Sequence, residues 1–190
     1  MRSFFLFAFV FMASLNAQSQ VIDFFREDLK FRLFENRIEV SGDYYFRNNS
    51  SKPLVLKLKY PFPKNEDFGK VEAIECTDLS DSVNSIDFIK QEYLMFTVSI
   101  PAHEEKAYRI AYHQQLLANR ALYILTSTRQ WGKSLEHITY ELFVENLHID
   151  SLSYIPDKTE VFTDSIRFFW QKKNFMPDRN FEVFFTKQKQ

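Results

Sequence analysis

The sequence predicts an all-β protein, an antiparallel β-sandwich of about ten short strands. Apolar and polar residues alternate with a period of two along most of the chain, which is the pattern of a half-buried strand. Aromatic residues, which favour pleated surfaces, are abundant, with 22 Phe and 9 Tyr against only 3 Gly. Clusters of Asn and Ser and six prolines separate the alternating segments. Short strands punctuated in this way are typical of a sandwich or a barrel.

The first three predicted strands form a meander. Apolar residues share one face over residues 29–33, 38–46 and 54–60, with charged residues on the other face. The short polar side chains of residues 48–51 suit a turn. Pro61-Phe62-Pro63 ends the third strand, because proline cannot donate a hydrogen bond to a neighbouring strand.

The rest of the chain continues the same alternation. The clearest apolar faces belong to residues 94–100 and 138–144, and Pro101 ends the first of these. Shorter or less regular strands are expected at residues 71–77, 86–90, 108–112, 123–125, 149–154, 160–162, 166–170 and 181–185.

Residues 104–122 fit two structures. Ala107, Ile110, Ala111 and Gln114 stand at helical spacing among good helix formers. The same stretch also alternates as a strand. We expect a strand followed by one short helical turn near residues 116–120, with a helix over the whole stretch as the alternative.

The N-terminus has the order of a secretory signal peptide. Arg2 provides a basic start, residues 4–15 are almost entirely apolar, and Ala17 offers a small residue at a cleavage position. The expected organisation is therefore a signal peptide at residues 1–17 and a single β-sandwich domain at residues 18–190. Gln18 stands where a lipoprotein would carry cysteine, so we expect a soluble periplasmic or extracellular protein without a lipid anchor and without a stable membrane span after cleavage.

Charge and composition exclude several function classes. The chain has 24 Lys and Arg against 25 Asp and Glu, and no basic stripe stands out, so we expect no nucleic-acid partner. The three glycines are too far apart for a phosphate-binding loop. The single cysteine, Cys76, excludes an internal disulfide; it is either a small apolar strand residue or a thiol that pairs between chains.

Several segments resemble a family of secreted bacterial β-sandwich proteins of unknown function. They are Glu27-Asp28-Leu29, the strand from Val40 to Asn48, Tyr60-Pro61-Phe62-Pro63, Tyr123 to Trp131, and Asn174-Phe175-Met176-Pro177. The first half is also loosely similar to the vault protein/inter-alpha-trypsin β-sandwich domain. The resemblance implies an exported β-sandwich, and it brings no catalytic residue to this chain.

No motif indicates catalysis, a metal or a cofactor. The histidines, His103, His113, His137 and His148, do not form a ligand pair at strand spacing or an HExxH helix. The loop with Asp78, Asp81 and Asp87 lacks the glycine and glutamate of an EF-hand, and turn formation explains it. A Gly-x-Ser-x-Gly elbow is absent, and no local basic partner activates Cys76. Glu39, Glu72, Glu141 and Glu145 are explained as a solvated outer face, so no catalytic pair is nominated. We therefore expect no enzyme activity and no cofactor.

Two aromatic segments are the candidate binding residues. Trp131 lies in a polar stretch, where its ring could stack on a sugar or a peptide or fold back over the sandwich. Phe168, Phe169 and Trp170 are consecutive, so either both faces of their strand are covered or one face carries an apolar patch for a partner. Phe184-Phe185 raises the same question.

Three functions follow, in order of preference. The first is an exported, non-enzymatic cell-envelope interaction or structural module that docks a protein through residues 168–170. The second is a glycan-binding module that uses exposed aromatic residues such as Trp131. The third is a hydrolase whose site is assembled from residues distant in sequence.

Overall fold

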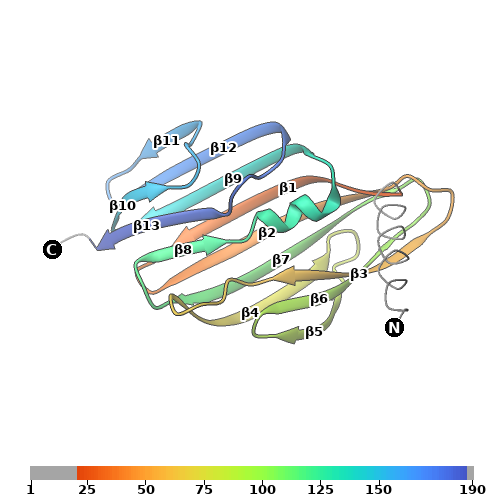
Figure 1. Ribbon diagram of the computed structural model, residues 1–190, viewed down its shortest axis with the longest axis horizontal. Helices are drawn as coiled ribbons and strands as arrows, with labels where there is room; N and C mark the ends of the chain where they lie inside the picture. Colours follow the sequence, from red (N-terminus) through yellow and green to blue (C-terminus); the bar gives the residue numbers. More distant parts are fainter. Residues whose placement is uncertain (1–20, 188–190) are drawn as a thin grey trace, which may run out of the picture.

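The computed structural model describes residues 21–187 as two layers of β-sheet (Figure 1). One layer is a seven-stranded sheet with the strand order β11-β12-β9-β1-β2-β7-β4. The other layer consists of two three-stranded sheets, β10-β13-β8 and β3-β6-β5. The predicted all-β sandwich is confirmed, with thirteen strands and one short 3-10 helix, η1, in the described part of the chain.

The strands of the large sheet are β1 (Ile22–Leu33), β2 (Arg37–Asn48), β4 (Phe68–Asp78), β7 (Glu105–Leu116), β9 (Leu135–Glu145), β11 (Lys158–Val161) and β12 (Ser165–Phe175). The small sheets contain β3 (Leu54–Pro61), β5 (Ile86–Lys90) and β6 (Tyr93–Ile100), and β8 (Arg120–Tyr123), β10 (Leu147–Leu152) and β13 (Phe181–Lys187). The helix η1 covers Thr126–Trp131. Neighbouring strands are antiparallel except β1 and β9, which pair in parallel from Arg26↔His137 to Leu33↔Val144.

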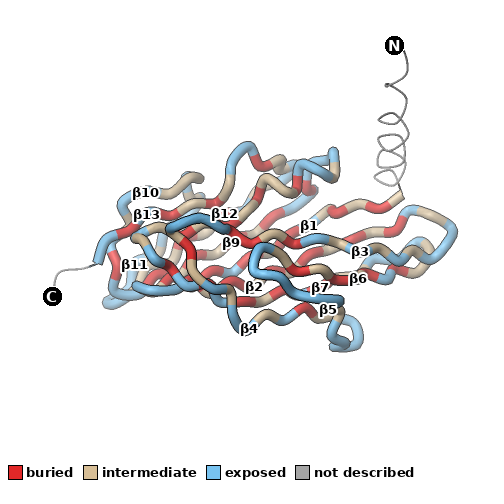
Figure 2. The backbone as a smooth tube through the Cα atoms, turned by 60° about the horizontal axis from the view of Figure 1, so that its bottom comes forward, coloured by how far each residue is buried: buried red, intermediate tan, exposed pale blue. Residues whose placement is uncertain are grey.

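Period-two burial follows the predicted faces. In β2, Ile38, Val40, Tyr44 and Phe46 face the core, while the intervening residues lie on the outer face. Figure 2 shows the same alternation of buried and more exposed positions along the strands. Burial of these apolar faces between the two layers is the main source of stability expected for the fold.

A register shift in β1 determines which of its residues face the core. The pairing with β2 is irregular between Phe24 and Arg26, so Ile22 and Phe24 point inward before the shift, and Glu27 and Leu29 point inward after it. A bulge of this kind redirects side chains at one position of a strand. It places a carboxyl group on the apolar face of the large sheet.

The helical turn predicted near residues 116–120 is wrong, and so is the alternative of a helix over residues 104–122. Glu105–Leu116 is strand β7, which pairs with β2 on one side and β4 on the other. Pairing on both edges overrides the helix propensity of the Ala and Gln residues there. The helix of the described chain lies farther along, at Thr126–Trp131, and ends at Gly132, whose φ of 70° suits a helix C-terminus.

Two other expectations concern the compartment and the cysteine. The predicted signal peptide, residues 1–17, lies outside the described residues. Between residues 21 and 187, no helix has the length and apolar character needed to cross a membrane.

Cys76 is only 1% exposed in β4, where burial raises the pKa of its thiol to about 12, as expected for a small apolar core residue.

Candidate functional site

The outer layer is divided, and a pocket lies where its two small sheets separate. The helix η1 and the strand β3 lie in front of the large sheet, and β1 and β2 form the surface behind them (Figure 1). The space has a volume of about 360 Å³, within the range of small-ligand sites. We call it the inter-sheet pocket. Its principal lining residues are Phe24, Glu27, Tyr44 and Phe46 on the large sheet, Leu56, Leu58 and Tyr60 on β3, and Tyr123, Thr128 and Trp131 on the opposite side.

Chain geometry explains why the pocket stays open. The strand β8 is only four residues long, because the chain leaves the sheet and turns into η1. On the other side, β3 is the edge of its sheet. The inward side chains of Leu56 and Leu58 are therefore half-buried, whereas Phe96 and Val98, their neighbours on β6, are 3% and 0% exposed.

Trp131, a predicted binding candidate, lies in the wall of the inter-sheet pocket. Its ring centroid is 5.8 Å from that of Phe24 and 5.6 Å from that of Phe46. The ring thus folds back over the sandwich, as one of the two sequence interpretations proposed, but it remains half-buried. The three rings give the pocket an aromatic wall formed by η1, β1 and β2.

The other predicted candidates do not form an exposed surface. Phe168 and Trp170 point into the core, with exposures of 8% and 1%, and the Trp170 indole N–H donates to the Tyr154 carbonyl at 3.2 Å. Phe169 points to the opposite face of the large sheet and is half-buried. The three rings therefore do not form one exposed aromatic patch: Phe168 and Trp170 are covered by the second layer, and Phe169 alone lies on the outer face, opposite Glu141 of β9. Of the second pair, Phe185 is buried and Phe184 is 41% exposed.

A buried carboxyl group lies at the deep end of the inter-sheet pocket. Glu27 is 2% exposed. Its Oε2 accepts a hydrogen bond from the Tyr140 hydroxyl at 2.6 Å, and its Oε1 accepts one from the Tyr123 hydroxyl at 3.1 Å. A buried carboxyl group without such partners would strongly destabilise the fold.

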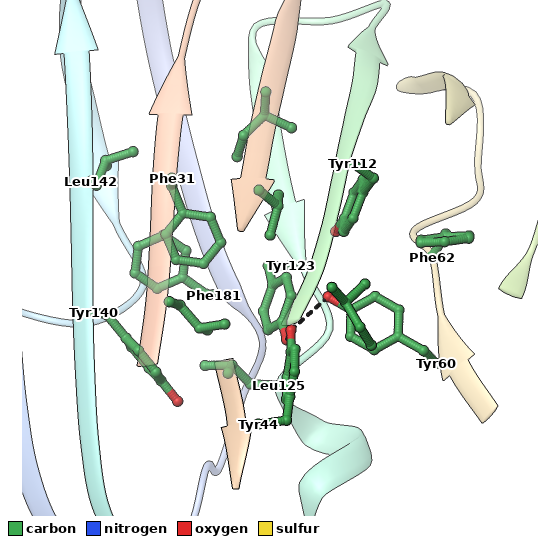
Figure 3. Close-up of a cluster of buried hydrophobic side chains, with 14 of the residues drawn as sticks. Phe31, Tyr44, Tyr60, Phe62, Tyr112, Tyr123, Leu125, Tyr140, Leu142 and Phe181 are labelled. Carbon is green, nitrogen blue, oxygen red and sulfur yellow. Dashed lines mark hydrogen bonds between the residues drawn. The ribbon is translucent and has the colours of Figure 1, made fainter. Parts of the chain in front are cut away.

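The hydrogen-bond network continues from Glu27 toward the opposite small sheet. The Tyr44 hydroxyl lies 2.8 Å from that of Tyr123 and 2.9 Å from that of Tyr60 (Figure 3). Gly42 leaves room for this arrangement, since a Cβ at that position would lie 2.7 Å from Leu29 Cδ2 and would also strike the Tyr44 hydroxyl. The network therefore links the large sheet to both small sheets beneath the pocket.

Burial shifts the titration of the whole network. Desolvation raises the pKa of Glu27 to about 7, although the hydrogen bonds from Tyr140 and Tyr123 favour its ionised form. Desolvation also raises the pKa of the Tyr44, Tyr60, Tyr123 and Tyr140 hydroxyls well above the usual value. The tyrosines thus remain protonated donors, while Glu27 changes charge near neutral pH.

We expect Tyr44→Phe to lower the free energy of unfolding by about 1–2 kcal/mol, because it removes a hydroxyl that bridges two others in the core. Tyr112→Phe is the matched control. The Tyr112 ring lies 6.1 Å from that of Tyr60, but its buried hydroxyl makes no hydrogen bond within the described chain. Its removal should be neutral or slightly stabilising. Urea unfolding checks both values, and equal losses for the two variants would contradict the network.

The remaining sequence candidates lie elsewhere on the molecule. Glu39, Glu141 and Glu145 pair with arginines on the outer face of the large sheet, as expected for a solvated face. Asp78, the last residue of β4, accepts hydrogen bonds from Ser80 and Lys106 and so stabilises the turn that follows the strand. Residues 21–187 contain no group of three His, Cys, Asp or Glu side chains placed to hold a metal ion.

Sequence reasoning missed Glu27, although a signal was present. Glu27 stands two residues before Leu29, in the same alternation as Phe31 and Leu33. Extending the predicted strand of residues 29–33 toward the N-terminus would therefore have placed Glu27 on the apolar face. The tyrosine partners also lie on predicted apolar faces. Their convergence depends on how the sheets stack.

Comparisons with known proteins identify the fold and no family. No protein-family model matches the chain, and no curated protein matches its sequence. Its structure is similar to a Legionella pneumophila protein described as a "putative nutrient binding protein", with a TM-score of 0.64 and 13% identity over 87% of this chain and 67% of that one. It is also similar to an M1 zinc metallopeptidase from Deinococcus radiodurans, with a TM-score of 0.51 and 11% identity over 87% of this chain.

A variant of that peptidase bound to a Tyr-Ser-Ala substrate matches with a TM-score of 0.53 and 12% identity over 87% of this chain. This chain spans only 42% and 43% of the two peptidase chains. The TM-scores establish a shared β-sandwich architecture, and identities this low do not transfer an activity.

Proposed function

We propose that this chain is an exported, non-enzymatic binding module of the cell envelope that holds its ligand in the inter-sheet pocket. The observation that carries the proposal is the pocket itself, an opening of about 360 Å³ with an aromatic wall of Trp131, Phe24 and Phe46. An apolar pocket with a few convergent polar groups is the usual form of a ligand site. Export rests on the signal-peptide pattern of residues 1–17.

The polar groups in the pocket suit binding better than catalysis. Both oxygens of Glu27 accept hydrogen bonds from tyrosines of the core, so the carboxyl group is held in place by the fold. Trp131 offers a ring for stacking, and Ser127, Thr128 and Gln130 add polar residues to the lining. The nutrient-binding description of the Legionella pneumophila protein, which shares the fold, is compatible with a binding role.

The test is affinity retention from envelope extract, with half of the extract treated with protease. We compare the wild-type chain, Trp131→Ala, and Phe88→Ala as a control that removes a 46% exposed ring outside the pocket. We expect wild type and Phe88→Ala to retain the same component and Trp131→Ala to retain at least tenfold less. A protein ligand would be retained only from the untreated half, and a glycan from both halves. Equal retention by Trp131→Ala would contradict the proposal.

A further inference from the structure

Within residues 21–187, one edge of the sandwich has backbone groups without partners beside the inter-sheet pocket. The strand β3 pairs with β6 on one side only. Just beyond β3, the Phe62 N–H donates to the Glu92 carbonyl at 2.9 Å, in the same register as the β3–β6 pairs. Hydrogen-bonded and non-hydrogen-bonded pairs alternate in antiparallel strands. The N–H and C=O groups of Val55, Lys57 and Lys59 therefore point away from β6.

Two of these three residues border the pocket. Lys57 and Lys59 both contribute to its lining, although the Lys57 side chain is 73% exposed on the outer face of the sheet. Within residues 21–187, no backbone hydrogen bond joins β3 to any element other than β6. We call this row of groups the β3 edge. Its chemistry matches an incoming strand, which would supply the missing carbonyl and amide partners.

The side chains of β3 indicate which residues such a strand would carry. The inward residues Leu56 and Leu58 are half-buried and border the pocket, so apolar side chains of an added strand would complete their burial. On the outward face, Lys57 and Lys59 are both exposed. The Lys57 Nζ lies 3.9 Å from an Asp87 carboxylate oxygen, and the Lys59 Nζ lies over the Tyr93 ring. The positive charges of both lysines are therefore available to an acidic residue on an added strand.

Charge also excludes one alternative occupant. If two copies of the chain paired through their β3 edges, lysines would face lysines across the junction, and like charges directly opposite each other destabilise a strand pair. An acidic strand from a different chain avoids this repulsion. Lysines also protect edge strands from unwanted pairing, but the inward positions of β3, where a charge would block pairing, are leucines.

We propose that the β3 edge accepts an extended peptide by strand addition, with apolar residues facing the inter-sheet pocket and acidic residues facing outward beside Lys57 and Lys59. This inference rests on the proposed function, because it names the class of ligand for the same pocket. Main-chain hydrogen bonds to β3 provide affinity, and the alternation of apolar and acidic side chains provides specificity.

The test uses the full chain and a library of seven-residue peptides in which Val, Leu or Phe alternates with Glu or Asp. We expect saturable binding by calorimetry and slower hydrogen exchange of the Lys57 and Lys59 amides, while the amides of Leu56 and Leu58, already bonded to β6, change little. The same peptides with lysine in place of the acids should bind at least tenfold more weakly. A Lys57→Glu, Lys59→Glu double variant should reverse that preference.

A second control separates strand pairing from simple occupancy of the pocket. Methylation of alternate peptide nitrogens removes donors to β3 but keeps every side chain, and it should weaken binding at least tenfold. Equal binding of the methylated peptide, or no binding by any library member, would overturn strand addition. The proposed function would then still stand if retention from envelope extract depended on Trp131, and it would fail by itself if it did not.

Discussion

The free energy of unfolding should fall by roughly 2–3 kcal/mol between pH 5 and pH 8, and Glu27→Gln should remove most of this fall. The cause is the buried carboxyl group of Glu27, whose pKa rises from 4.5 to about 7 in the folded chain. Desolvation favours its protonated form despite the hydrogen bonds from Tyr123 and Tyr140.

The direction of the effect follows from proton counting. Between pH 4.5 and 7 the folded chain keeps the Glu27 proton, while the unfolded chain releases it. Unfolding therefore releases a proton, and rising pH favours the unfolded state. The stabilisation is complete below pH 4.5, is lost as the pH rises through 7, and changes no further above that.

Urea unfolding at several pH values measures this effect. Glu27→Gln keeps the size of the side chain and offers an amide oxygen and an amide N–H to the two tyrosines, but it cannot titrate. The difference between the two pH profiles thus isolates Glu27 from all other ionisable groups. Parallel profiles for wild type and Glu27→Gln would contradict a buried carboxyl group with a raised pKa.

Trp170→Ala should lower the free energy of unfolding by about 3–5 kcal/mol, because it leaves a large cavity in the core. Trp170 is 1% exposed, and its ring meets that of Phe181 at 5.1 Å in an edge-to-face contact. The substitution also leaves the Tyr154 carbonyl without the hydrogen bond that the Trp170 indole N–H donates. The residue is thus a part of the core that joins β12 to the small sheet of β13.

Phe169→Ala is the internal control for this experiment. Phe169 is the neighbour of Trp170 in sequence, but it points to the opposite face of the large sheet and is half-buried. We expect it to lose only about 1 kcal/mol. Chemical unfolding followed by circular dichroism measures both variants. Similar small losses, together with loss of a binding partner from Trp170→Ala, would restore residues 168–170 as a docking surface.

Much of the fold could be predicted because local alternation determines which face of a strand is buried. The faces of β2, β6 and β9 follow directly from their apolar residues. The parallel pairing of β1 with β9 has no local signal, since it joins Arg26 to His137 across most of the chain. The strand β7 was ambiguous for the opposite reason, because its composition allows a helix that pairing on both edges excludes.

The candidate site was predicted only in part. Trp131 was identified from its polar surroundings, but its contacts with Phe24 and Phe46 depend on how η1 crosses the large sheet. The aromatic run at residues 168–170 suggested a surface, yet the alternation of β12 turns Phe168 and Trp170 into the core and leaves only Phe169 on the outer face. The inter-sheet pocket had no counterpart in the sequence, since it arises where β3 and η1 leave the outer layer incomplete.

Acrylamide quenching of tryptophan fluorescence tests most directly whether the inter-sheet pocket binds a ligand. The chain has two tryptophans, and only Trp131 is accessible, because Trp170 is 1% exposed. A component retained from envelope extract, or an acidic alternating peptide that binds, should reduce quenching to the level of a Trp131→Phe variant. Unchanged quenching at saturation, with binding verified by calorimetry, would place the ligand elsewhere and contradict the account.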